Sequence, residues 1–102
     1  MNLEKWKEHR IPIYFWEELI GSVVTFKYVD GLCETTVVCG LLDSIGIITE
    51  SGNPKPLHLI YTVEPGVGDW NRYRVDSAYF LNVFSLKDTI RWRLMNNIMW
   101  CP

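Results

Sequence analysis

The sequence has 102 residues, of which 48% are hydrophobic, 22% charged and 14% aromatic. This length is typical of a single domain that forms one hydrophobic core without the help of metals or disulfides. The formal net charge of −2 excludes a surface that is basic throughout, which duplex DNA binding requires. We therefore expect one globular domain over residues 1–102 that does not bind duplex DNA.

The charge is unevenly distributed along the chain. Residues 1–69 contain five basic and ten acidic side chains, whereas residues 70–102 contain five basic and two acidic ones. A long polyanion is therefore not favoured as a ligand. A small anionic ligand has a basic region available near the C-terminal end.

The cysteines and the apolar segments indicate where the protein acts. The chain has three cysteines, Cys33, Cys39 and Cys101, which cannot all form disulfides within one chain. The first residues lack the pattern of a secretory signal. These features favour the reducing cytoplasm. No apolar stretch approaches the roughly 20 residues that span a bilayer, so no membrane insertion is expected.

The N-terminal part of the chain predicts a short helix. Pro12 interrupts any longer helix, and residues 14–20 follow as a helical turn that Gly21 ends. Leu19 and Ile20 are expected to face the core.

Residues 22–29 are rich in β-branched and aromatic side chains and predict the first strand. Asp30 and Gly31 follow directly, and this pair is typical of a two-residue hairpin turn. We expect an antiparallel ladder in which Val29 and Leu32 flank the turn.

Three further strands are predicted before residue 64. Residues 34–42 form the second strand, and Gly40 inside it favours a bulge or a sharp bend. Residues 46–50 form the third strand, a Gly and Pro turn occupies 51–56, and residues 57–63 form the fourth.

The last third of the chain begins with a Gly-containing loop over 64–69 and the segment 70–76, followed by a fifth strand over 79–84. Ser85 with an acidic residue three positions later is an N-cap signature. A final helix is predicted over 86–99. Its buried stripe is expected to comprise Leu86, Ile90, Leu94 and Ile98.

This order of elements predicts a mainly β fold: a small, bent, five-stranded antiparallel barrel or roll with a short N-terminal helix and a C-terminal helix. The β-barrel occupies residues 19–84, and residues 85–102 form a helical extension. The stretch 19–84 resembles the Sm-like small β-barrels, in which a short helix precedes five bent strands and a glycine lies midway along the second, as Gly40 does. The resemblance implies ring-like or dimeric assembly, with ligands bound near subunit boundaries.

No motif for catalysis is present. The chain has no Gly-x-Ser-x-Gly elbow, no phosphate-binding P-loop, no His-Glu-x-x-His and no Cys-x-x-Cys pair. Cys33 and Cys39 are interpreted as buried apolar thiols, and His58 as a surface residue or a hydrogen-bonded inward one. We therefore expect a protein that is not an enzyme, with no catalytic residues, no metal and no cofactor.

The segment 70–74 alternates planar rings with guanidinium groups, which are the side chains that stack on bases and grip phosphate. The final helix repeats this composition around Trp92. The candidate ligand-binding residues are Trp70, Asn71, Arg72, Tyr73, Arg74, Arg91 and Arg93. The alternative interpretation is structural: the two strand arginines pair with Asp69 and Asp76, and Trp92 fills the seam between helix and barrel.

The leading functional hypothesis is a homo-oligomeric binding protein that sequesters an anionic, nucleotide-type small molecule. In size, acidity and lack of catalytic groups the chain is similar to phage proteins with Sm-like barrels that sequester host nucleotide signals, and this similarity implies a viral accessory, anti-defence role. One alternative is an inhibitor or adaptor that binds a host protein through an aromatic and acidic surface. The other is a single-stranded RNA binder.

Overall fold

The computed structural model describes residues 12–49, 51–52, 54–66 and 70–99. No helix within these ranges is long and apolar enough to cross a membrane. The elements in chain order are α2 (Ile13–Glu18), β1 (Val23–Val29), β2 (Thr35–Ile48), β3 (Leu57–Val63), β4 (Asn71–Arg74), the 3-10 helix η1 (Val75–Ser77), β5 (Ala78–Val83) and α3 (Leu86–Met95).

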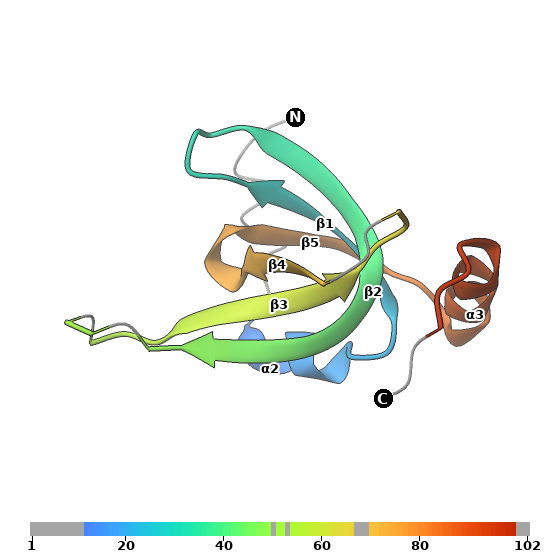
Figure 1. The fold of residues 1–102 in the computed structure, drawn as a ribbon, viewed down its shortest axis with the longest axis horizontal. Coiled ribbons are helices and arrows are strands. Elements are labelled where there is room, and N and C mark those ends of the chain that lie inside the picture. Colours follow the sequence, from blue (N-terminus) through green and yellow to red (C-terminus); the bar gives the residue numbers. More distant parts are fainter. Residues whose placement is uncertain (1–11, 50, 53, 67–69, 100–102) are drawn as a thin grey trace.

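The strands form one antiparallel sheet in the order β4-β3-β2-β1-β5 (Figure 1). The predicted mainly β class, with a short helix before the sheet and another after it, is confirmed. The terms barrel and roll fit loosely, because β4 and β5 do not pair and leave the sheet open at two edges.

The β1–β2 connection is longer than predicted. The antiparallel ladder is confirmed, but its last pair joins Val29 to Thr35, so Leu32 lies within the turn and does not flank it. The Asp30 carboxylate accepts hydrogen bonds from the backbone N–H groups of Leu32 and Glu34, at 2.8 and 3.0 Å. This side chain stabilises a wider loop in place of the predicted two-residue turn. Cys33 lies in this loop and is exposed, and Cys39 is half-buried, so the predicted burial of both thiols is wrong.

Strand β2 is one 14-residue strand where two strands, 34–42 and 46–50, were predicted. Its ladder with β3 changes register between Leu42 and Ser44, which marks a bulge at Asp43. The bulge lets the strand bend without ending, as its curved ribbon in Figure 1 shows. The predicted fifth strand, 79–84, is observed as β5. The additional strand β4 lies in the segment 70–76, which was placed on a strand only in the structural interpretation of its arginines.

The core lies between α2 and the inner face of the sheet. Trp16 is fully buried and packs edge-to-face on Phe26 and Phe80, with ring centroids 5.7 and 6.2 Å apart. Leu19 packs against this cluster as predicted. Ile20, however, is 40% exposed, because the helix ends before it and the chain turns away through Gly21.

Helix α3 lies beyond the end of the sheet (Figure 1). Its predicted cap is confirmed, since Ser85 Oγ accepts a hydrogen bond from the Asp88 N–H at 3.2 Å, but the helix ends at Met95, four residues earlier than predicted. The predicted buried stripe is wrong. Thr89, 2% exposed, faces the sheet instead, and the apolar stripe turns to solvent with exposures of 78% at Leu86, 46% at Ile90 and 74% at Leu94.

Candidate ligand-binding site

The predicted segment 70–74 has two faces, because side chains alternate along β4. Arg72 and Arg74 are exposed, whereas Asn71 and Tyr73 turn towards the interior. Trp70, directly before the strand, is 56% exposed. The segment therefore divides its candidate ligand-binding residues between an outer and an inner surface.

The outer surface combines rings with guanidinium groups. Arg72 pairs with Tyr61 across the β3–β4 ladder, so their side chains lie on the same face. The Tyr61 ring in turn covers Gly46, where a Cβ atom would be only 2.7 Å from Cε2 of the ring. Arg74 forms an exposed ion pair with Asp76 at 3.4 Å, which is one of the two predicted pairs. The other, with Asp69, falls outside the described residues.

The inner surface is a hydrogen-bonded cluster centred on the Glu64 carboxylate. Oε2 of Glu64 accepts hydrogen bonds from Thr62 Oγ1 at 2.7 Å, Asn71 Nδ2 at 2.8 Å and the Tyr73 hydroxyl at 2.8 Å. Burial and the bond to Glu64 raise the pKa of Tyr73 well above its usual value. Asn71 and Tyr73 therefore connect the end of β3 to β4 through their polar atoms.

The sequence offered little to identify the role of Glu64. It stands directly before a Pro-Gly pair and was interpreted as part of a loop. Its three donors lie two, seven and nine residues away, and the strand pairing of β3 with β4 is what brings them together.

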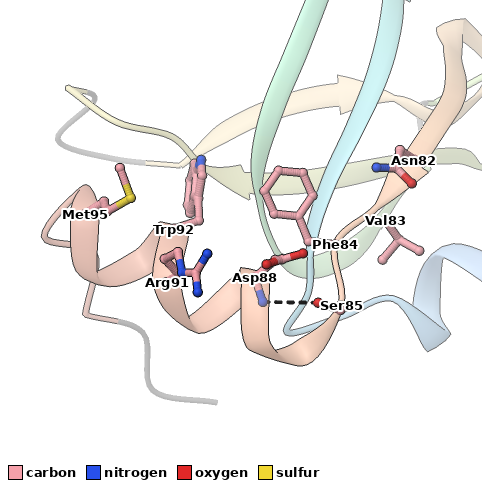
Figure 2. Close-up of a pocket in the computed structure, with 8 residues that line it drawn as sticks. All are labelled: Asn82, Val83, Phe84, Ser85, Asp88, Arg91, Trp92 and Met95. Atoms are coloured by element: carbon pink, nitrogen blue, oxygen red, sulfur yellow. Dashed lines mark hydrogen bonds between the residues drawn. The ribbon is translucent and has the colours of Figure 1, made fainter.

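A pocket of about 290 Å³ lies between the end of β5 and α3 (Figure 2). It contains one of the predicted ligand-binding residues, Arg91. It also contains two aromatic side chains that were not predicted as site residues. The complete lining is Asn82, Val83, Phe84, Ser85, Asp88, Arg91, Trp92 and Met95.

The side chains of this pocket come from a short stretch of chain. Figure 2 shows the Trp92 ring projecting from α3 and the Phe84 ring projecting from the chain just before the helix, with Asp88 and Arg91 projecting from the helix near them. Trp92 and Phe84 are both half-buried, and Arg91 is exposed. The pocket thus presents two ring surfaces, one cation and one carboxylate to the same small volume.

The predicted site residues of segment 70–74 and those of the final helix do not share this pocket. Its lining includes Arg91 but neither Arg93 nor any residue of β4. Arg93 is half-buried. Phe84 was missed because it was assigned to the end of a strand. Trp92 was noted between the two candidate arginines of the helix but was assigned to packing between helix and barrel. Only the position of α3 relative to β5 reveals that both rings line one pocket.

Within the described part of the chain, no three His, Cys, Asp or Glu side chains are grouped so that they could hold a metal ion. In comparisons with known proteins, no family model matches the chain, no curated protein matches its sequence, and no solved structure matches its fold.

Proposed function

We propose that the protein is a non-enzymatic binding module that takes an anionic, nucleotide-type small molecule into the pocket between β5 and α3 and sequesters it there. The observation that supports this proposal is that Phe84, Arg91 and Trp92 line the same pocket. The resemblance to Sm-like barrels and the viral accessory role remain predictions.

The chemistry of the lining suits a ligand that carries both a flat ring and a phosphate. An indole or phenyl face stacks on a nucleobase, and a guanidinium group binds phosphate through two parallel hydrogen bonds. At the edge of a base, the Asn82 amide can donate and accept hydrogen bonds, and the Asp88 carboxylate can accept them. A volume of about 290 Å³ is at the lower end for ligand pockets, which favours one small molecule over a polymer.

Calorimetric titration with a panel of linear and cyclic mononucleotides tests the proposal. Arg91→Ala removes a charge-assisted contact of about 1.5–3 kcal/mol and is expected to weaken binding roughly ten- to a hundredfold. Trp92→Ala is expected to cost about 1–3 kcal/mol through lost stacking. Added salt should weaken the arginine contribution and leave the stacking contribution largely unchanged.

The matched control is Arg72→Ala, which removes the same charge from the outer face of β4, outside the pocket. Its affinity should equal that of the wild type. If Arg72→Ala abolishes binding and Arg91→Ala does not, the ligand binds on β4 instead. If no nucleotide in the panel binds, the proposed function is wrong.

A second candidate function is a protein-binding inhibitor or adaptor, and the β1–β2 hairpin favours it. Leu32 and Val37 are 83% and 62% exposed there, beside the acidic Asp30 and Glu34. Exposed apolar side chains with an acidic border are typical of a partner interface. Leu32→Ser with Val37→Ser should abolish binding of a protein captured by the wild type and leave nucleotide titrations unchanged.

A further inference from the structure

Helix α3 presents an apolar and basic face to solvent. Leu86, Ile90 and Leu94 recur at four-residue spacing and form an exposed apolar stripe along the helix. Lys87 and Arg91 are exposed and border the stripe, because they precede Ile90 and Leu94 by three residues each. An amphipathic helix normally buries such an apolar stripe. Here it meets no part of its own chain among the described residues that would bury it.

Helix α2 presents a face of the complementary kind. Tyr14 and Phe15 are 57% and 43% exposed and pack on one another, with ring centroids 4.7 Å apart. Glu17 and Glu18 are exposed on the same short helix, and its first turn and last turn carry no basic residue. This face offers aromatic anchors with negative charge beside them, whereas α3 offers aliphatic side chains with positive charge beside them.

We infer that α3 of one copy of the chain docks on α2 of a second copy. In this contact the α3 stripe covers the Tyr14–Phe15 pair, and Lys87 and Arg91 face Glu17 and Glu18. Within one chain the two faces lie apart, because α2 packs against the sheet along β2 and α3 lies beyond the end of the sheet (Figure 1). A second copy provides both the apolar surface and the opposite charge that each helix lacks.

The contact joins two different surfaces, so it has a defined consequence for assembly. Two copies can exchange both contacts around a two-fold axis, or successive copies can form a ring or a chain. The inference does not depend on the proposed nucleotide site, because every measurement below uses the ligand-free protein.

Sedimentation velocity over a wide range of protein concentrations tests this contact. The mass should rise with concentration, and high salt should shift the protein towards the monomer because the contact is partly ionic. The double variants Glu17→Lys with Glu18→Lys, and Lys87→Glu with Arg91→Glu, place like charges against one another. Each should weaken association roughly tenfold or more.

Mixing the two double variants is the decisive step. In the mixture, the basic α3 of one variant meets the acidic α2 of the other, and the reversed pair is again of opposite charge. Association should therefore return to nearly that of the wild type. This recovery distinguishes a contact between copies from general destabilisation by either pair of substitutions.

The matched control is Lys55→Glu with Arg72→Glu, which changes the net charge as much as the α3 double variant does, at exposed positions outside both helices. It should associate like the wild type. If the lysine variant of α2 does not fold, as circular dichroism would show, Glu17→Gln with Glu18→Gln should weaken association in the same direction. A wild type that is monomeric throughout, assembly that persists in both reversals, or a mixture that stays dissociated would each overturn the inference.

Discussion

At the scale of single residues, Gly40 shows how the Glu64 cluster constrains the sheet. A Cβ atom at Gly40 would be 2.9 Å from Cγ of Glu64 and 3.2 Å from both Cβ of Thr62 and the carbonyl oxygen of Val63. The Glu64 side chain cannot move aside cheaply, because its carboxylate accepts three hydrogen bonds. The glycine thus allows β2 to approach the end of β3 closely.

We therefore expect Gly40→Ala to lower the free energy of unfolding by about 1–3 kcal/mol. The control is Gly31→Ala, because a Cβ atom there has no neighbour within 4 Å. This variant should be as stable as the wild type or slightly more stable, since alanine reduces the freedom of the unfolded chain. Urea denaturation measures both, and equal stabilities would contradict the close approach at Gly40.

Tyr73 gives the stability a predictable dependence on pH. Because burial and Glu64 raise its pKa in the folded protein, the folded state keeps the phenol proton at pH values where the unfolded chain, with a tyrosine pKa of about 10, has lost it. The unfolded state then binds fewer protons, so the free energy of unfolding falls as pH rises above about 10. We expect this fall to be shallower in Tyr73→Phe.

At neutral pH, Tyr73→Phe should cost about 0.5–1.5 kcal/mol, since two donors still satisfy Glu64. Urea denaturation at neutral and alkaline pH provides both values. Tyr14→Phe, which removes an exposed hydroxyl, controls for the loss of one tyrosine. Parallel pH profiles for the wild type and Tyr73→Phe would contradict the assigned role of the cluster.

At the scale of elements, a polar side chain attaches α3 to the sheet. The buried Thr89 accepts a hydrogen bond through Oγ1 from the backbone N–H of Val23 at 3.2 Å. Thr89→Val keeps the shape but leaves this N–H without its acceptor, which should cost about 1–3 kcal/mol. Leu94→Ala should change stability by less than about 0.5 kcal/mol because Leu94 is exposed.

Chemical denaturation of the two α3 variants compares the predicted orientation of the helix with the observed one. A loss of several kcal/mol in Leu94→Ala and none in Thr89→Val would mean that the apolar stripe is the buried face.

The elements that local chemistry specifies were predicted well from the sequence. The strand 57–63 and the Ser85 cap agree with the structure, and the strand 22–29 agrees to within one residue. The orientation of α3 could not be predicted this way. A four-residue apolar spacing is the same whether the stripe packs on its own core or on another molecule.

The candidate site was predicted only in part, for a similar reason. Arg91 was identified from its residue type, and the structure places it in a pocket. Phe84 carried no signal, because an aromatic residue at the end of a strand is common in any core. Asn71 and Tyr73 had the composition of ligand contacts, but strand alternation turns them towards Glu64. Whether these side chains contact a ligand or Glu64 depends on which strands are neighbours in the sheet.

At the scale of the whole molecule, the open sheet leaves two edges, and β4 is one of them. An edge strand exposes unpaired backbone groups to which another chain can add a strand. Strand β4 has only four residues, and two of them, Arg72 and Arg74, are exposed arginines. Short length and charged side chains are features that protect an edge from pairing. The same arginines that resemble ligand contacts therefore also suit a protective role.

Arg72→Thr combined with Arg74→Thr tests this protective role, because threonine favours strands and carries no charge. We expect the variant to aggregate through its β4 edge, with increased light scattering and thioflavin fluorescence on incubation. The substitutions change the formal net charge from −2 to −4, so a general loss of repulsion cannot explain the aggregation. Lys27→Thr with Lys55→Thr makes the same change in charge away from β4, since Lys27 lies on β1 between two paired strands, and should remain as soluble as the wild type. If both double variants behave alike, the arginines do not protect the edge, and ligand binding on the outer face of β4 becomes the better explanation for their exposure.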